Sequence, residues 1–249
     1  MLLAGRTILV TGGSRGIGAA TARRLAGHGA AVAVNYASNE AAARGVVEAI
    51  TAAGGRAVAI QADARDPVQV EALFRQAEAA LGPIDTLVLN ANMSFPVALF
   101  TAMPWEGFQQ KLLGELASAF HACKAAVPGM IQRRKGCIIA VSSGLSRQPG
   151  EGFSAHTTAK SGLDALMKSL ALELGPHGIR VNVVAPGLTE TDATAHFPEA
   201  AKTAAGSRLP LRRIGQPDDV AGIIALVASD EAGYLTGQYL SAGGGGMML

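Results

Sequence analysis

The sequence predicts an α/β protein built on one doubly wound parallel sheet of the Rossmann type. Short apolar runs rich in Val, Ile and Ala alternate with longer stretches of helical periodicity, which is typical of repeated strand–helix–strand units. A glycine-rich turn separates the first of these strands from the first helix. The chain has 249 residues, of which 49% are hydrophobic, and this suits one undivided domain over residues 1–249.

Each element follows from its own pattern. Uninterrupted apolar runs suit parallel strands covered by helices on both faces, and they are found at residues 7–10, 31–34, 57–60, 84–89, 137–141, 181–184 and 238–240. Helices are expected where apolar residues recur three and four positions apart, at residues 16–27, 40–53, 67–81, around 105–131 and 155–174. Pro217 suits the beginning of another helix, because proline is favoured at early helical positions.

The charge pattern excludes two classes of partner. The net charge is +2 and the basic residues are scattered, whereas nucleic-acid binding needs clustered Lys and Arg. No apolar run of membrane-spanning length lacks a Gly, a Pro or a charge. Cys123 and Cys137 lie in apolar segments without a CxxC pattern, so we expect no metal site. These features predict a cytoplasmic protein that binds neither nucleic acid nor membrane.

Residues 11–18, Thr-Gly-Gly-Ser-Arg-Gly-Ile-Gly, lie directly between the first strand and the first helix. Glycines at such a turn let the backbone approach a pyrophosphate, which then lies at the N-terminus of the helix. A glycine pattern in this context is far more specific than an isolated one. The sequence therefore predicts a dinucleotide-binding site here.

The end of the second strand favours NADP(H) over NAD(H). A carboxylate at this point would bind the ribose hydroxyls and repel a 2′-phosphate. The chain instead has Asn35 here, and no acid follows until Glu40. Arg15 in the glycine loop can pair with the 2′-phosphate through charge-assisted hydrogen bonds. We therefore expect NADP(H) as the cofactor, with Arg15 and Asn35 among the residues that bind it.

Four motifs together resemble the short-chain dehydrogenase/reductase family, and the resemblance runs from residue 6 to about residue 247. They are the glycine loop, Asp63, Asn90-Ala91 and the segment 186–191. In that family the Asp contacts the adenine ring, although Asp63 would also suit an ordinary helix cap. The resemblance implies a set of cofactor-binding residues: Gly12, Ser14, Arg15, Gly16, Ile17, Gly18, Asp63, Asn90, Ala91, Lys160, Pro186, Gly187, Thr189 and Thr191.

Ser143, His156 and Lys160 have the spacing of the family's proton relay, in which a Tyr stands at the middle position. In the family, the Tyr gives a proton to the substrate carbonyl, the Ser binds the carbonyl oxygen and the Lys holds the nicotinamide ribose. Glu115 replaces the family's water-anchoring Asn, and Asn92 stands where the family has Gly. Because positions 156 and 160 share one helix face, we expect Glu115 to approach that face from the neighbouring helix.

The substituted relay leaves more than one role open. His156 can act as acid or base in place of Tyr, with Glu115 tuning it, or it can fill a polar cavity that has lost its activity. Glu115 can form a simple ion pair with Lys160, and Ser143 can be an ordinary turn residue. Asn92 is the mildest change, because Asn tolerates a left-handed backbone better than most residues.

Within the family, the pattern is most similar to the 3-oxoacyl-[acyl-carrier-protein] reductases. This resemblance implies NADPH-dependent hydride transfer to the keto group of a small-molecule or carrier-bound acyl substrate, with Ser143, His156, Lys160 and Glu115 as catalytic residues. It also implies a substrate lid around residues 191–211 and a homotetramer or homodimer. Two other functions remain open, namely acid–base chemistry without redox (dehydration, cyclisation or isomerisation) and a cofactor-binding partner subunit without its own activity.

Overall fold

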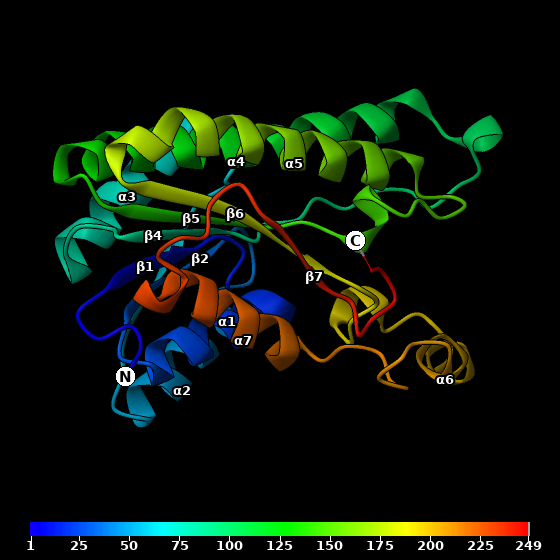
Figure 1. Cartoon of the computed structure of the whole chain (residues 1–249), viewed down its shortest axis with the longest axis horizontal. Helices are drawn as coiled ribbons and strands as arrows, with labels where there is room; N and C mark the ends of the chain where they lie inside the picture. Colours follow the sequence, from blue (N-terminus) through cyan, green and yellow to red (C-terminus); the bar gives the residue numbers. More distant parts are fainter. Residues whose placement is uncertain (249) are drawn as a thin grey trace.

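The structure is a computed structural model that describes residues 1–248. Seven parallel strands form one sheet in the order β3-β2-β1-β4-β5-β6-β7, and helices cover both faces of it (Figure 1). The chain builds outwards from β1 to β3 and then crosses to β4 on the other side of β1. Ligands of such sheets bind at the carboxyl ends of the strands, beside this crossing. The predicted single-domain, doubly wound α/β fold is confirmed.

The strands are short runs of Val, Ile, Leu and Ala, and those at the centre of the sheet are wholly buried. Alternate side chains point to opposite faces, so Leu9 belongs to one hydrophobic core, while Ile8 and Val10 belong to the other. The bounds are β1 Thr7–Val10, β2 Ala31–Tyr36, β3 Arg56–Gln61, β4 Thr86–Leu89, β5 Gly136–Val141, β6 Ile179–Pro186 and β7 Tyr239–Ala242.

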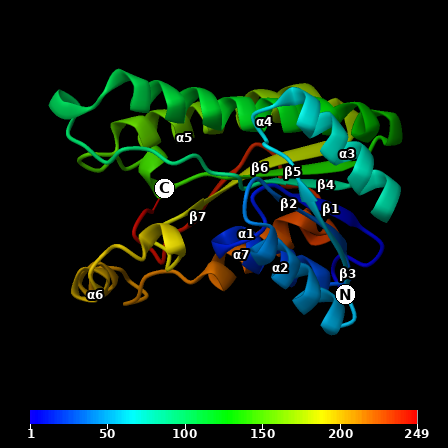
Figure 2. The same cartoon turned by 180° about the vertical axis from the view of Figure 1, so that it is seen from behind.

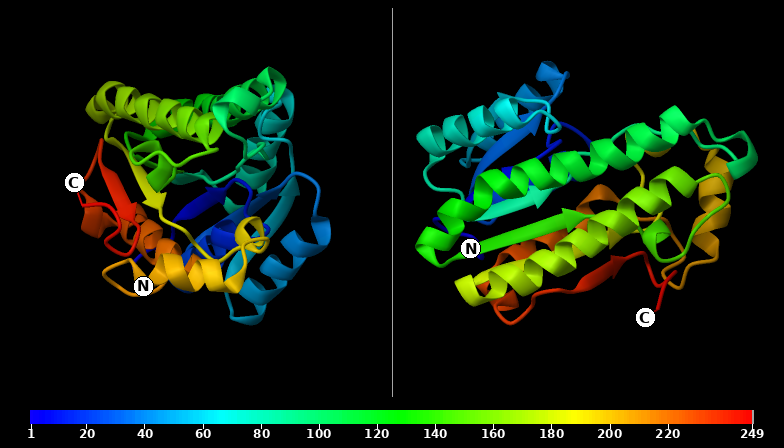
Figure 3. Two further views of the ribbon diagram at one scale, coloured as in Figure 1. Left: turned by 90° about the vertical axis from the view of Figure 1, so that its right-hand side faces the viewer. Right: turned by 90° about the horizontal axis from the view of Figure 1, so that it is seen from above.

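Helices α3, α4 and α5 cover one face of the sheet, and α1, α2 and α7 cover the other (Figures 1 and 3). Seen from above, α4 and α5 lie side by side along the first face (Figure 3). Their bounds are α1 Gly16–Gly27, α2 Glu40–Ala52, α3 Pro67–Leu81, α4 Trp105–Arg133, α5 Ser154–Leu174 and α7 Pro217–Ala228. Short 3₁₀ turns connect them: η1 Phe100–Ala102, η2 Gly144–Ser146, η3 Gly175–His177, η4 Asp192–Thr194 and η5 Asp230–Ala232.

One helix was not predicted from the sequence. It is α6 (Glu199–Ser207), which stands apart from both helical layers, at the end of the molecule where the loop before α4 also lies (Figures 1 and 2). Its sequence has Ala as its only apolar residue type, so the amphipathic pattern that reveals the other helices is missing. None of the helices within residues 1–248 is both long and apolar enough to cross a bilayer.

Candidate active site

Three of the predicted catalytic residues, Glu115, His156 and Lys160, lie close together where the first turns of α5 pass α4, and Lys160 reaches the carboxyl end of β5. His156 and Lys160 lie one turn apart on α5 and are buried, and Glu115 is buried on α4. The Nζ of Lys160 donates hydrogen bonds to the carbonyl of Val141, at 2.7 Å, and to Oε1 of Glu115, at 2.6 Å. The ion pair between Glu115 and Lys160 that the sequence left open is therefore present.

Glu115 bridges two lysines rather than one. Its Oε2 accepts a hydrogen bond from the Nζ of Lys111, one turn earlier on α4, at 2.5 Å. The three side chains of Lys111, Glu115 and Lys160 are at most 4% exposed. Burial alone would raise the pKa of Glu115, but the charges of Lys160 and Lys111 outweigh it and hold that pKa below its usual value. Glu115 is therefore ionised between two ammonium groups.

Lys111 was not predicted as a site residue. All three of its N–H donors are used, because Nζ also binds Oδ1 of Asn92 at 2.6 Å and the carbonyl of Met93 at 3.2 Å. Burial lowers the pKa of Lys111 to about 8, Glu115 opposes that shift, and the ammonium is charged at neutral pH. The only sequence signal was its spacing of four residues from Glu115, which places both on one helix face.

The imidazole of His156 is neutral. Its ring stacks on Phe95, with the ring centroids 4.6 Å apart and the planes at 21°. Burial is the main cause that lowers the pKa of His156 to about 3, and the charges of Lys160 and Lys111 act in the same direction. The charge of Glu115 raises this pKa, but it is outweighed by burial and by the two lysines. The Nδ1 atom is buried without a hydrogen-bond partner among residues 1–248.

The neutral imidazole makes stability depend on pH. In the unfolded chain His156 takes up a proton as pH falls through about 6.5, whereas in the folded protein it does so only near pH 3. The unfolded state therefore binds more protons across this window, and the free energy of unfolding falls as pH falls. From pH 7 to pH 5 this loss should be about 2 kcal/mol.

Denaturant unfolding of the wild type and of His156→Phe between pH 7 and pH 5 measures this contribution. Phenylalanine keeps an aromatic ring against Phe95 and cannot titrate, so the variant should lose about 2 kcal/mol less than the wild type over that range. Parallel pH profiles for the two proteins would show that His156 is not held neutral by the fold.

Ser143 lies just after the end of β5. Its Oγ accepts a hydrogen bond from the backbone N–H of Leu145, at 3.2 Å, so the turn role that the sequence left open is present. Its hydroxyl proton is not used in this bond. The phenol of Tyr239 donates to the Ser143 carbonyl at 3.0 Å. Ser146 Oγ lies 3.2 Å from that phenol and donates to Asp164 at 2.6 Å. These bonds fix Ser143 from η2, α5 and β7 together.

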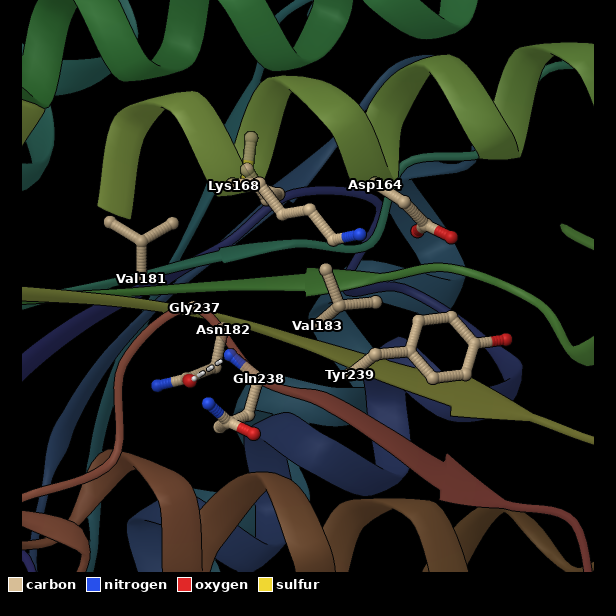
Figure 4. A pocket seen from close by; sticks show the side chains of 9 residues that line it. Asp164, Lys168, Val181, Asn182, Val183, Gly237, Gln238 and Tyr239 are labelled. Carbon is tan, nitrogen blue, oxygen red and sulfur yellow. Dashed lines mark hydrogen bonds between the residues drawn. The ribbon is translucent and has the colours of Figure 1, made fainter. Parts of the chain in front are cut away.

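A very small cavity of about 10 Å³ adjoins these residues, between α5, β6 and the segment that enters β7 (Figure 4). Asp164 reaches it from the helix and Tyr239 from the strand, as Figure 4 shows. Burial raises the pKa of Asp164, and its Oδ1 has no hydrogen-bond partner within residues 1–248. The cavity is therefore lined by Asp164 and Tyr239, which belong to the hydrogen-bond chain that holds the Ser143 carbonyl.

The glycine loop fits closely against the end of β4. A Cβ on Gly18 would lie 2.3 Å from the Gly12 carbonyl oxygen and 2.5 Å from Nδ2 of Asn90. A Cβ on Gly12 would lie 2.9 Å from the Cα of Ala91, and Gly12 and Gly16 have φ values of +60° and +52°. The Nδ2 of Asn90 donates to the carbonyls of Thr11 and Gly12, at 3.1 and 2.9 Å. Asn90 and Ala91, directly after β4, thus support the loop.

The N-terminus of α1 fits the pyrophosphate of a dinucleotide. Arg15 is the N-cap residue, it makes no side-chain cap hydrogen bond, and the first turn from Gly16 through Ile17 to Gly18 contains no acid. The N–H groups of this turn are therefore free of capping side chains, as an anion site requires. The methyl group of Thr191 would lie 3.4 Å from a Cβ on Gly16, so the segment after β6 reaches over the loop.

The remaining predicted cofactor residues differ in where they lie. Pro186 ends β6, Gly187 donates its N–H to Ala242, and the hydroxyl of Thr189 donates to the Gly187 carbonyl at 3.0 Å. Ser14, in the loop, is partly exposed and can reach a phosphate. Pro186, Gly187 and Thr189 shape the turn that carries Thr191, and this role needs no direct contact with a cofactor.

Asn35 does not face the predicted cofactor site. It is 2% exposed, its Oδ1 accepts from the N–H of Gly12 at 3.2 Å, and its Nδ2 donates to the carbonyl of Ala62 at 3.0 Å. The amide therefore braces the glycine loop against β3. Asp63 is not a helix cap, because Asp66 caps α3 and the Asp63 carboxylate pairs with Arg65, at 2.6 Å.

Comparison with known proteins decides the family. A family model described as enoyl-(acyl carrier protein) reductase matches residues 12–246. A short-chain dehydrogenase/reductase variant from Serratia marcescens superposes with a TM-score of 0.89 at 36% identity, over 98% of this chain and 99% of that chain. The chain belongs to the short-chain dehydrogenase/reductase family. A dehydrogenase/reductase from Sinorhizobium meliloti also superposes with a TM-score of 0.89, at 40% identity, over 98% of this chain and 95% of that one.

Family members with curated descriptions are oxidoreductases. The chain is 42% identical to an L-rhamnose 1-dehydrogenase (NAD(P)(+)) of Azotobacter vinelandii, over 98% of both proteins. It is 41% identical to an uncharacterized oxidoreductase of Methylorubrum extorquens, again over 98% of both. A third relative is the 3-oxoacyl-[acyl-carrier-protein] reductase FabG of Staphylococcus aureus, which is 38% identical over 96% of this chain and 97% of the relative.

Two departures of this family member from the relay pattern belong to one hydrogen-bonded group. Asn92, in place of Gly, does not have a left-handed backbone; among the non-glycine residues of 1–248, positive φ occurs at Arg134 and Arg212. Its side chain instead accepts a hydrogen bond from Lys111, which binds Glu115. The tolerance of Asn for positive φ is therefore not needed here.

Proposed function

We propose that this chain is an NADP(H)-dependent oxidoreductase that transfers a hydride to the keto group of an acyl-thioester or polyketide-like substrate. The observation that carries the proposal is the placement of Lys160, which Glu115 and Val141 fix at the end of the strand that leads into Ser143. The glycine loop also keeps the close packing that a dinucleotide site requires. The relationship to 3-oxoacyl-[acyl-carrier-protein] reductases supports this substrate class.

The residues would hold the cofactor along the carboxyl ends of β1, β4 and β6. The first turn of α1 would bind the pyrophosphate. Arg15 would bind the 2′-phosphate, because the amide of Asn35 is already hydrogen-bonded inside the protein and cannot do so. Lys160 has one N–H left after its bonds to Glu115 and Val141, which suits a ribose hydroxyl. Thr191 would contact the nicotinamide end.

The bound nicotinamide supplies the hydride, and the chain must manage the proton. The hydroxyl of Ser143 would hold the substrate oxygen. A neutral His156 would deliver a proton from one ring nitrogen to the substrate oxygen, and bulk solvent would return a proton to the other ring nitrogen through water. The unpartnered Nδ1 atom is buried, so this return requires water to enter when substrate binds. His156 would thus take the role of the family's Tyr, and Glu115 would act on it only indirectly, by fixing Lys160.

The segment around 191–211 would act as the substrate lid. This segment begins after the carboxyl end of β6 and contains α6. The Nζ of Lys202 on α6 donates a hydrogen bond to Oε1 of Glu190, at 2.7 Å, and so ties α6 to the beginning of the segment. Lys202 itself is buried. Segments of this kind commonly close over substrates in enzymes. A homodimer or homotetramer is the assembly expected from the family.

A second candidate is acid–base chemistry without redox, such as dehydration, cyclisation or isomerisation of a similar substrate. The observation that favours it is the unpartnered Nδ1 of the buried imidazole, which can accept a proton from a substrate held against it. One observable separates the two candidates. Acid–base chemistry would form product without any change in NADPH absorbance, whereas hydride transfer would consume NADPH.

Calorimetric titration with NADPH and with NADH tests the proposed cofactor. NADPH should bind at least about tenfold more tightly, because a paired 2′-phosphate contributes more than about 1.4 kcal/mol. Arg15→Ala should remove most of this preference, while Arg23→Ala, an exposed change on the same helix, should leave it intact. Failure of the wild type to bind either nucleotide would overturn the proposed function.

A further inference from the structure

The buried group of Lys111, Glu115 and Lys160 carries a surplus positive charge. Two ammonium groups share one carboxylate, so the group has a net charge of +1. His156 adds nothing to it, because its imidazole is neutral. The group is almost fully enclosed, with Lys111 at 0% exposure, so solvent screens it far less than it screens a surface charge.

The neighbouring acids do not cancel this charge. Asp164 lies one turn beyond Lys160 on α5, and it has its own cation in Arg147, whose Nε lies 4.0 Å away. The Asp63 carboxylate, after β3, is paired with Arg65. Both of these carboxylates therefore have a cationic partner of their own.

We propose that this surplus charge makes the site prefer the reduced cofactor over the oxidised one. The inference rests on the proposed function, which places the nicotinamide ribose at Lys160. The nicotinamide ring is uncharged in NADPH and positive in NADP⁺, and every other part of the two molecules is the same. A fixed positive charge beside the ring therefore weakens NADP⁺ binding selectively.

Lys111 is the source of the surplus. Without it, Glu115 and Lys160 would form a neutral pair, which would still hold Lys160 in place. Lys111 does not touch the cofactor site, since its three N–H donors end on Glu115, Asn92 and Met93. Stability does not explain a second buried lysine, because apolar residues often replace buried ion pairs without loss. Lys111 is thus a positioning residue that sets the charge of the site.

The test is the ratio of the Kd for NADP⁺ to the Kd for NADPH, measured by calorimetry at one ionic strength. Substitutions set the net charge of the group: Lys111→Met and Lys111→Gln each make it 0, and Lys111→Met combined with Glu115→Gln restores +1. Relative to the wild type, the ratio should fall about tenfold in either single variant and return to within about twofold in the double variant, as expected for one unit charge acting over roughly 10 Å at an effective dielectric of 20.

Lys124→Met is the matched control, because it removes an exposed lysine from the same helix and should leave the ratio unchanged. An equal ratio in all these proteins, with both nucleotides still bound, would overturn the inference and leave the proposed function standing. If Lys111→Met does not fold, Lys111→Gln, which keeps a hydrogen-bond donor for Glu115, still decides the question. No binding of either nucleotide to the wild type would overturn both.

Discussion

Replacing Gly18 with alanine is expected to abolish cofactor binding and to destabilise the fold. The added methyl group would lie 2.3 Å from the Gly12 carbonyl oxygen and 2.5 Å from Nδ2 of Asn90, which are themselves hydrogen-bonded. Neither is the free end of a flexible side chain, so the glycine loop must move away from β4. Overpacking of this kind costs about 1–3 kcal/mol, and displacement of the loop should weaken NADPH binding about 100-fold or more.

Gly27→Ala is the matched control for this change. Gly27 ends the same helix, and no atom lies within 4 Å of the position that its Cβ would take. Alanine is the better helix former, so this variant should unfold at equal or slightly higher denaturant concentration, by up to about 1 kcal/mol, and should bind NADPH normally. Equal losses of affinity in the two variants would contradict the role given to the loop.

Replacing Lys160 with methionine is expected to lower turnover by about 100-fold or more, the range typical for loss of a group in a proton-transfer site. Methionine keeps the apolar length of the side chain but removes the bonds to Glu115 and Val141 and the remaining N–H. The fold should survive, because Glu115 keeps Lys111 as a partner. Turnover is measured as NADPH consumed with a 3-oxoacyl thioester.

Lys168→Met is the control for that measurement. Lys168 lies two turns further along α5 and is exposed, so its loss removes an equal charge without touching Glu115. It should retain wild-type turnover. If Lys160→Met were as active as this control, Lys160 would not belong to the catalytic site.

The features that the sequence predicted well are those encoded by local pattern. Each central strand is a separate run of apolar residues. The glycine-rich sequence of residues 11–18, between a strand and a helix, is typical of a dinucleotide-binding loop and of few other structures. The sheet and the place of the glycine loop between β1 and α1 followed directly. α6 did not, because its burial pattern is carried by Lys202 and Gly206 rather than by apolar side chains.

The details of the site depended on contacts between distant segments. The sequence placed Asn35 at the end of β2, yet only the structure shows that its amide turns inward to Gly12 and Ala62. The expected partnership of Glu115 with His156 gave way to the lysines, because a carboxylate between two ammonium groups has both oxygens occupied. The neutral state of His156 arises from burial, with Phe95 of another segment stacked on its ring.

The central claim is that hydride transfer persists with His156 in place of the family's Tyr. The most direct test mixes the wild-type protein with NADPH and a 3-oxoacyl thioester, and follows the NADPH absorbance together with the amount of hydroxyacyl product. The account predicts one NADPH oxidised for each hydroxyacyl thioester formed. Conversion of the thioester without loss of NADPH absorbance, by a protein that binds NADPH, would contradict it and would point to acid–base chemistry without redox.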